Sequence, residues 1–319
     1  MAHQIEADDS MFSVRETPWH GLGKVVKNAP TTREAITMAG LDWKVETKTM
    51  AVEDIGDTVP GFRAVVRDSD TKVLGVVSSK WKPLQNDKAF EWFQPWVDSG
   101  SVTLETAGSL RGGQIVWVLA KIAGDAGVVV PKSDDKVIPF ILLSNSHDGT
   151  RAVRAGFTPI RVVCANTLAI AHGGSTGKLL KVRHTASVVD AVQAVRESMD
   201  LVQREFVATI HQYRTLAMAG VDAKSLDKYV RRVFNLEADE DNGKRILNKV
   251  IPLFEGGKGN HLAGVRGTYW AAYNAVAEFL AYERGNSQDN RLASLWFGDS
   301  SNTNARALQV GLEMVREAA

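Results

Sequence analysis

The hydrophobic period of the chain changes near residue 185, and this change constrains the fold more than any other feature. Before it, short runs rich in β-branched residues form three pairs: 61–68 with 72–79, 100–110 with 112–122, and 137–146 with 150–158. The last pair flanks Asp148-Gly149, and Asp-Gly between apolar runs is typical of a β-hairpin because its turn needs positive φ. We therefore expect a strand-rich first half made of hairpins.

Helices are also expected within this first half. Residues 31–40 predict a helix with Thr31 or Thr32 as its cap and Gly40 as its stop. Residues 89–97 have helical spacing, but Pro95 makes that helix short or kinked. The run that begins at Cys164 predicts a further helix, with Asn166 or Thr167 near its start.

After residue 185, helical spacing dominates. A heptad seam with spacings of four and three comprises Val188, Val192, Val195, Met199, Val202, Phe206, Thr209 and Tyr213. Further helices are expected near 224–235, 243–254, 268–284 and 303–318. The seam has two readings: it mediates self-assembly or partner docking, or it is the core stripe of a helix within one chain.

Together these patterns predict an α+β fold. Antiparallel hairpins form a sheet packed on helices, and a mainly helical C-terminal region with a long heptad-patterned helix follows. The expected domains are 1–185, strand-rich, and 186–319, helical. The single cysteine excludes an intrachain disulfide and a multi-cysteine zinc site. No signal-peptide pattern and no long apolar run is visible, so we expect a cytoplasmic protein without a membrane partner.

Positive charge is concentrated in one segment of a chain whose net charge is only +1. No Asp or Glu occurs between Asp148 and Asp190. That window holds six basic residues: Arg151, Arg154, Arg161, Lys178, Lys181 and Arg183. It indicates either an anion-binding strip or a chance cluster on a solvated surface. If a strand begins at residue 151, Arg151 and Arg154 point to opposite faces unless a bulge intervenes.

A second basic element lies outside that window. Lys80 and Lys82 flank Trp81 in a predicted loop. A basic–aromatic–basic triplet can stack a base and hold the adjacent phosphates, or the tryptophan simply anchors the loop.

Other motifs indicate less chemistry. The glycine-rich stretches 19–24 and 255–260 contain a lysine but do not fit a phosphate-binding loop consensus. The histidines are scattered, without the paired spacing of a metal site, and Cys164 is interpreted as a core thiol rather than a nucleophile. A metal-dependent nuclease would need clustered carboxylates, and the spacing of Glu105, Asp125 and Asp148 does not select them.

Three motifs carry a resemblance to a known family. "ETPWHGLG" (16–23), "HDGTRAV" with "TPIRVVCANTL" (147–168), and "GTYWAAYNAVAEF" (267–279) are similar to a family of phage- and plasmid-borne proteins, catalogued as domain of unknown function number 932. That resemblance implies a role in DNA replication, recombination or maintenance inside a bacterial host cell. A more distant likeness to phage single-strand annealing proteins of the Erf and Redβ type implies a curved antiparallel sheet and assembly into rings or filaments.

Three functions follow as hypotheses. The first is a single-stranded DNA-binding protein, acting by a basic groove without a cofactor and capable of promoting annealing or recombination. Its contacts would come from Arg151, Arg154, Arg161, Lys178, Lys181, Arg183, Lys80, Trp81 and Lys82. The second is a structural or regulatory protein that self-assembles, and the third is a metal-dependent nucleic-acid enzyme. We expect no catalytic residues, no metal and a homo-oligomer under the first hypothesis.

Overall fold

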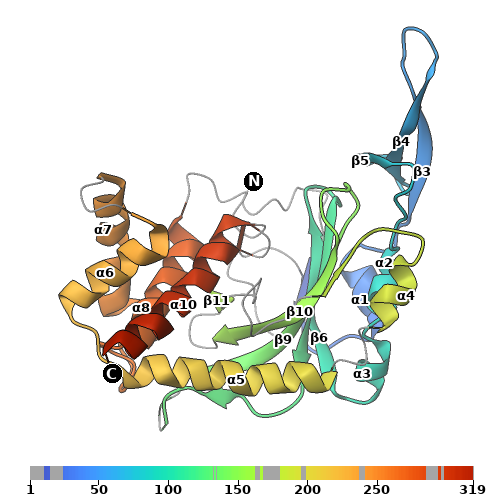
Figure 1. Cartoon of the computed structure of the whole chain (residues 1–319). Coiled ribbons are helices and arrows are strands. Elements are labelled where there is room, and N and C mark those ends of the chain that lie inside the picture. The colour runs from blue at the N-terminus through green and yellow to red at the C-terminus, as the bar shows by residue number, and fades with distance from the viewer. Residues whose placement is uncertain are drawn as a thin grey trace. The chain divides into compact units, whose positions relative to one another are not determined.

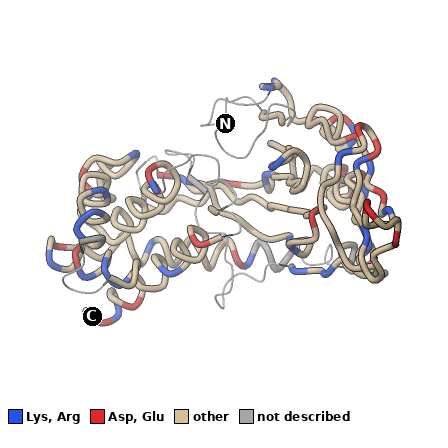
Figure 2. Tube along the Cα trace, turned by 90° about the horizontal axis from the view of Figure 1, so that it is seen from above, with Lys and Arg blue, Asp and Glu red and all other residues tan. Residues whose placement is uncertain are grey.

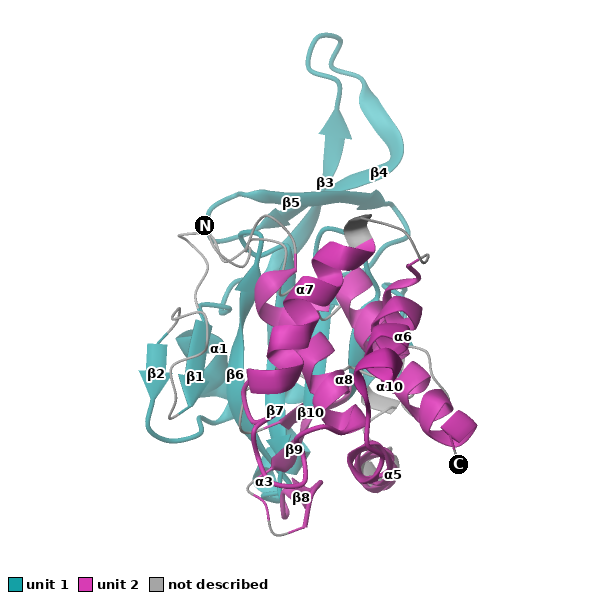
Figure 3. Cartoon of the chain, turned by 90° about the vertical axis from the view of Figure 1, so that its left-hand side faces the viewer, with its two compact units in different colours: residues 1–123, 141–156, 179–200 teal, residues 124–140, 157–178, 201–319 magenta. Residues whose placement is uncertain are grey.

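The computed structural model describes most of the chain: residues 11–14, 24–131, 133, 135–161, 166–167, 180–194, 199–236, 241–284, 294–295 and 298–318. The chain divides into two compact units (Figure 3). Unit 1 takes 1–123, 141–156 and 179–200, and unit 2 takes 124–140, 157–178 and 201–319. The units therefore interleave along the sequence instead of meeting at one boundary near 185.

The strands lie before residue 183 and the longer helices after 187, as the change in hydrophobic period predicts (Figure 1). The expected α+β class is confirmed. The larger sheet has the strand order β11-β10-β9-β7-β6-β1-β2, with β12 paired to β10 and β8 paired to β9. A separate three-stranded sheet has the order β3-β4-β5.

Unit 1 contains most of the strands. They are β1 (Met11–Val14), β2 (Lys24–Val26), β3 (Val45–Ala51), β4 (Thr58–Arg67), β5 (Val73–Ser78), β6 (Val102–Leu110), β7 (Ile115–Ile122) and β12 (Leu180–Val182). The later part of β9 (Lys136–Ser146) and the start of β10 (Val153–Arg161) complete it. The β4–β5 and β6–β7 pairs are the predicted hairpins, and both are antiparallel. The β1–β2 pair is parallel.

The helices of unit 1 are short. They are α1 (Thr32–Met38), α2 (Asn86–Glu91), α3 (Gln94–Asp98) and α4 (Val188–Ala194). Thr31 caps α1 in a reciprocal capping box with Glu34, and Gly40 follows at φ 61°, as the sequence predicts. The predicted kink at Pro95 is a complete break, because α2 ends at Glu91 and α3 starts again with Pro95 in its first turn.

The turn between β9 and β10 is fixed against the smaller sheet. A Cβ added to Gly75 on β5 would lie 2.6 Å from Cα of Asp148, and Gly149 takes φ 75° with Val77 close beside it. The Nε2 amide of Gln114 donates to the carbonyl of Leu74 at 2.9 Å. Only glycine fits at these two close approaches, so the turn is held in one place. This anchors the start of β10, where the basic window begins.

Unit 2 is mainly helical. Its helices are α5 (Met199–Met218), which begins at the unit boundary, α6 (Ala223–Phe234), α7 (Asp241–Gly256), α8 (Tyr269–Glu278), the π-helical turn η3 (Phe279–Glu283) and α10 (Asp299–Ala318). These confirm the four helices expected after residue 220. None of the described helices combines the length and apolar character that crossing a membrane requires.

Two short strands also belong to unit 2. β8 (Gly127–Val128) pairs with the first residues of β9, and β11 (Asn166–Thr167) pairs with Ile160 and Arg161 of β10. The prediction that Asn166 or Thr167 starts a helix is therefore wrong. Apolar periodicity in a short run does not separate a strand from a helix, and here pairing with β10 decides. Cys164 lies outside the described residues.

Four of the five heptad-seam side chains that the structure describes are buried within this chain, and the fifth, Phe206, is half-buried. Val188 and Val192 of α4 lie in the core of unit 1. Thr209 and Tyr213 of α5 are buried in unit 2, where the ring centroid of Tyr213 lies 4.6 Å from that of Trp270. The buried seam residues therefore act as core residues, which favours the reading of the seam as the core stripe of helices within one chain.

Candidate nucleic-acid interface

A pair of like charges faces across two strands of unit 1. In the antiparallel β10–β12 pair, Arg154 lies directly opposite Lys181, between the pairs Val153–Val182 and Ala155–Leu180. Val153 and Val182 are buried, so alternation places Arg154 and Lys181 together on the other face. Like charges directly opposite one another destabilise a sheet unless counter-charge is supplied. The pair therefore places two cationic side chains next to one another on this face.

The predicted basic–aromatic–basic loop joins the same region. The backbone N–H of Lys82 donates to the carbonyl of His184 at 3.1 Å, and Nδ1 of His184 donates to the carbonyl of Lys82 at 3.0 Å. The rings of Trp81 and His184 are stacked, with centroids 4.7 Å apart. Lys80 and Lys82 thus lie beside Arg183, although a hundred residues separate the two segments in sequence.

Two more arginines, Arg111 and Arg151, add positive charge to this region. Burial is the main cause that lowers the pKa of Arg151, and the positive charge of Arg111 is the next. Arg154 contributes further in the same direction, while Asp148 opposes it. Burial also lowers the pKa of Arg154. These guanidiniums are thus partly desolvated next to one another, a situation that a bound anion relieves.

We call this set the basic cluster: Lys80, Lys82, Arg111, Arg151, Arg154, Lys181 and Arg183, all in unit 1. Lys80, Lys82, Lys181 and Arg183 are exposed, and the three other arginines are half-buried. Figure 2 shows that acidic and basic residues are otherwise interspersed along the described chain. The sequence does not indicate Arg111 as a member of this cluster, because Arg111 lies far outside the acid-free window, at the tip of the β6–β7 hairpin.

Strand alternation does not place Arg151 and Arg154 on opposite faces. β10 begins at Val153, so Arg151 lies before the strand and its direction is not fixed by alternation. The influence of Arg154 on the pKa of Arg151 shows that the two positive charges interact. Both can therefore contribute to one field.

Arg161 does not belong to this cluster. Its guanidinium is fully buried in unit 2 and binds Asp135 through two hydrogen bonds, of 2.6 and 3.0 Å. It also donates to the carbonyls of Lys258 and Gly259 and to Oδ1 of Asn260. A guanidinium so buried and so fully engaged is not accessible to a phosphate, and the prediction that Arg161 binds nucleic acid is wrong.

The buried Arg161 instead organises a loop of unit 2. It lies over the ring of Trp270, 5.4 Å from the centroid, and Nε1 of Trp270 donates to Oδ2 of Asp135 at 2.6 Å. Two backbone carbonyls of the glycine-rich stretch 255–260 thus accept hydrogen bonds from Arg161 and are not available to a ligand. Lys178, the remaining basic residue of the acid-free window, lies outside the described residues.

Trp81 has only part of its ring available. His184 covers one face, so a base could stack only on the opposite face. The indole Nε1 of Trp81 is buried without a hydrogen-bond partner, as is Nε2 of His184. The loop-anchoring role of Trp81 is therefore visible in the structure, and it restricts the stacking role without removing it.

Unit 1 also has a buried polar pair, His147 and Asn86. His147 is fully buried, and its Nε2 lies 2.9 Å from Oδ1 of Asn86. Because the amide nitrogen of Asn86 donates to the carbonyls of Leu41 and Trp43, its oxygen accepts, and His147 donates. Burial and the neighbouring His184 lower the pKa of His147 to about 3. His147 is therefore neutral at pH 7.

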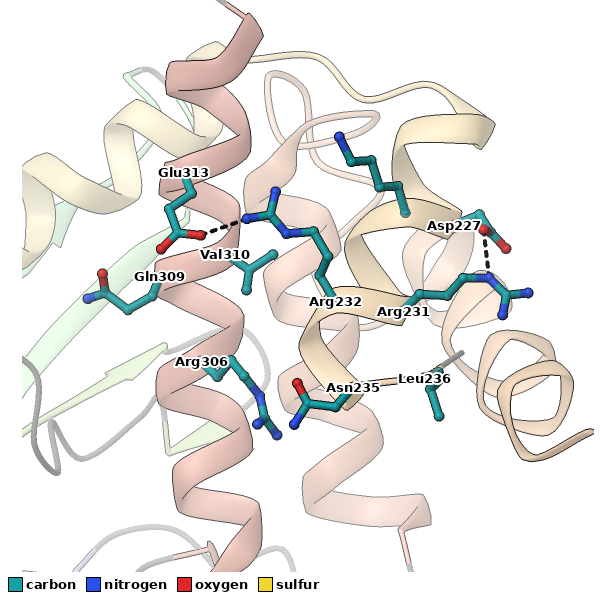
Figure 4. A pocket seen from close by; sticks show the side chains of 10 residues that line it. Asp227, Arg231, Arg232, Asn235, Leu236, Arg306, Gln309, Val310 and Glu313 are labelled. Atoms are coloured by element: carbon teal, nitrogen blue, oxygen red, sulfur yellow. Dashed lines mark hydrogen bonds and ion pairs between the residues drawn. The ribbon is translucent and has the colours of Figure 1, made fainter. Parts of the chain in front are cut away.

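Unit 2 has a groove that also contains arginines (Figure 4). It lies between α6 and α10, has a volume of about 650 Å³, and is lined in part by Arg231, Arg232 and Arg306. Arg232 bonds Glu313 at 2.7 Å, and Arg231 bonds Asp227 at 2.9 Å. Arg306 donates through Nε to the carbonyl of Val233 at 2.6 Å. The paired carboxylates make this groove a poorer phosphate site than the basic cluster.

The acidic residues that were considered as metal ligands do not form a metal-binding cluster among the described residues. An oxygen of Asp148 accepts from the hydroxyl groups of Ser146 and Thr150 and from the backbone N–H of Thr150, so it stabilises the hairpin turn. Within the part of the chain that the structure describes, no three His, Cys, Asp or Glu residues gather into a group that could hold a metal ion.

Comparison with known proteins gives a family. The model of the family described as "Domain of unknown function (DUF932)" matches residues 73–296, which is well over half of the chain. Neither the curated proteins nor the solved structures give a match. The matched span includes the β9–β10 hairpin, β12 and the Trp81 loop. The chain belongs to this family.

Proposed function

We propose that this member of the DUF932 family binds single-stranded DNA through the basic cluster of unit 1. The observation that carries the proposal is the cross-strand pair of like charges, Arg154 opposite Lys181, with Arg111 and Arg151 acting on the same field. A phosphate backbone supplies negative charge at regular spacing, which is what such a set of exposed and half-buried cations can neutralise.

The proposed mechanism is electrostatic. Exposed Lys80, Lys82, Lys181 and Arg183 neutralise successive phosphates, and the strand stays extended while its bases remain accessible. Two complementary strands whose repulsion is reduced in this way can pair, so the same surface would support annealing during recombination. This chemistry needs positioned cations, and it uses no metal and no cofactor.

The setting in which this would operate also belongs to the proposal. The motif resemblance to phage- and plasmid-borne proteins suggests a role in DNA recombination inside a bacterial cell, where the protein would act in the cytoplasm. Single strands arise there as replication and recombination intermediates, and they would be the physiological partner.

A titration without magnesium tests the proposal. Fluorescence anisotropy with a labelled oligo(dT) of about 30 nucleotides, longer than most single-strand site sizes, should show saturable binding at about 50 mM salt. A duplex of the same length should bind more weakly, because its bases cannot reach Trp81. No binding of the single strand under these conditions contradicts the proposal.

Matched variants locate the site. Arg154→Gln with Lys181→Gln removes the facing pair and should weaken binding about tenfold, in the range expected for two phosphate contacts. Lys249→Gln with Arg266→Gln removes the same charge from exposed positions of unit 2 and should leave the affinity within about twofold. Equal losses in the two double variants would show that net charge, not the basic cluster, determines binding.

A further inference from the structure

A two-stranded arm extends from unit 1. It consists of the distal parts of β3 and β4, residues 46–64, and it projects past the rest of unit 1 (Figure 1). The two strands pair in antiparallel register from Val45–Arg67 outward to Ala51–Thr58. At the base, the side-chain amide of Gln85 hydrogen-bonds both the N–H and the carbonyl of Val45. Beyond this point the side chains of β3 are exposed, except that of Met50, which is half-buried.

The tip of the arm, residues 52–57, carries both acidic side chains and exposed apolar side chains. It has three acids, Glu53, Asp54 and Asp57, and no Lys or Arg lies between Lys48 and Arg63. All three acids are exposed. Ile55 is 67% exposed and Val52 is 44% exposed, although isoleucine is among the residues most often buried.

Backbone hydrogen bonds hold the tip in one conformation. The N–H of Val52 donates to the carbonyl of Asp57 at 2.8 Å, and the N–H of Gly56 donates to the carbonyl of Val52 at 2.8 Å. Gly56 takes φ 71°, and a Cβ there would meet nothing within 4 Å. An ordered turn that presents an aliphatic side chain between carboxylates has the composition of a small docking element, with an apolar anchor and a charged rim.

We propose that the acidic tip of one copy docks onto the basic cluster of a second copy of this chain. The basis is charge complementarity on the same molecule. The tip offers three exposed carboxylates, and the basic cluster offers exposed Lys80, Lys82, Lys181 and Arg183. Opposite potentials of this kind steer association and set which surfaces meet.

The contact is heterologous, because a tip meets a cluster and not another tip. Such head-to-tail contacts produce a ring when the rotation closes and an open chain when it does not. A six-residue tip covers less surface than a stable dimer needs, so each contact is weak and salt-sensitive.

The docked tip and a nucleic acid would compete for one surface. The tip carries negative charge where DNA carries phosphate, so single-stranded DNA displaces it from the basic cluster. The inference uses the same cluster as the proposed function, but tip docking does not depend on DNA being the physiological ligand. Self-association without DNA therefore tests it separately.

Charge reversal on the two surfaces is the experiment. The tip variant carries Glu53→Lys, Asp54→Lys and Asp57→Lys, and the cluster variant carries Lys80→Glu, Lys181→Glu and Arg183→Glu. All six positions are exposed, so both variants are expected to fold, which circular dichroism checks. Sedimentation velocity at about 50 mM salt measures self-association of each variant, of their mixture and of wild type, without DNA.

The expected pattern is specific. Wild type self-associates and each variant alone does so at least about tenfold more weakly, because like charges now face one another. Mixing the two variants restores association, since the lysine tip meets the glutamate cluster. Ile55→Ser, with charge unchanged, also weakens wild-type association. A wild type that stays monomeric across the micromolar range, or a mixture that does not associate, overturns the inference.

The same variants separate this inference from the proposed function. The tip variant keeps the basic cluster and should still bind oligo(dT). Loss of self-association with DNA binding retained supports tip docking. DNA binding retained together with unchanged self-association overturns docking alone, and absence of DNA binding in wild type overturns the proposed function alone.

Discussion

Two sets of arginines, one in each unit, have different surroundings. In unit 2, Arg161 is buried against Asp135, and Arg231 and Arg232 at the α6–α10 groove bond carboxylates of the same chain. In unit 1, Arg154 faces Lys181, and Arg111 and Arg151 act on each other as like charges. Where the charge is compensated internally, arginine stabilises the fold. Where exposed lysines and half-buried arginines gather, the local positive field attracts an anion from outside.

The largest expected effect is at the buried pair. Arg161→Ala leaves Asp135 charged and unpaired in the core and should lower the free energy of unfolding by about 3–5 kcal/mol. Urea denaturation followed by circular dichroism measures it. Arg154→Ala is the matched comparison in unit 1, and we expect it to change stability by less than about 1 kcal/mol. Equal costs would remove the contrast between the two kinds of arginine.

Acid should destabilise unit 1 through His147. Its pKa is lowered to about 3 in the folded state, so between that value and about 6.5 the unfolded chain binds more protons. Stability is therefore full above pH 6.5 and falls as the pH is lowered, by roughly 2 kcal/mol at pH 5. Burial lowers the pKa of His184 too, which acts in the same direction.

The measurement is the free energy of unfolding at pH 7 and pH 5. His147→Gln, which keeps a polar side chain without an ionisable ring, should reduce the difference between the two values. A wild-type stability that rises from pH 7 to pH 5, or a variant with an unchanged difference, would contradict this assignment.

The hairpin turn that precedes the basic cluster should be intolerant of added volume. Gly75→Ala places a methyl group 2.6 Å from Cα of Asp148, and backbone cannot move aside as a side chain can. We expect a cost of about 1–3 kcal/mol and weaker DNA binding, because β10 starts at this turn. Gly256→Ala is a control, since a Cβ there meets nothing within 4 Å. Thermal unfolding and anisotropy measure the two effects.

The smallest expected effect is at the groove of unit 2. Arg232→Gln breaks ion pairs with Glu313 and Glu317, whose side chains are about half exposed, and should cost at most about 1 kcal/mol. Oligo(dT) affinity should stay within twofold of wild type. A tenfold loss of affinity would place a phosphate contact in the groove and would remove the distinction between the two units.

Local structure can be predicted from the sequence where it depends on residues that are adjacent in the chain. The Asp148-Gly149 turn, the cap at Thr31 and the shortening of the helix at Pro95 each depend on a few adjacent residues, and the sequence predicts each of them. The change of period near 185 likewise gave the order of strands and helices. Asn166–Thr167 was misassigned because pairing with β10, a tertiary contact, overrode the local pattern.

The candidate site was only partly predictable, for the same reason. The cations of β10 and β12 share one acid-free window, so composition indicates them. The approach of Lys82 to His184 and the influence of Arg111 on Arg151 come from tertiary contacts that leave no local pattern. Arg161 was misjudged because its partners Asp135 and Trp270 are distant in sequence, so the charge count could not show that it is neutralised.

The salt dependence of oligo(dT) binding tests whether Arg154 and Lys181 contact phosphates. Each phosphate contact contributes about 0.7 to the slope of log affinity against log salt for a single strand. We expect a slope about 1.4 smaller for Arg154→Gln with Lys181→Gln than for wild type, and an unchanged slope for Lys249→Gln with Arg266→Gln. Identical slopes for wild type and the Arg154–Lys181 variant would contradict it.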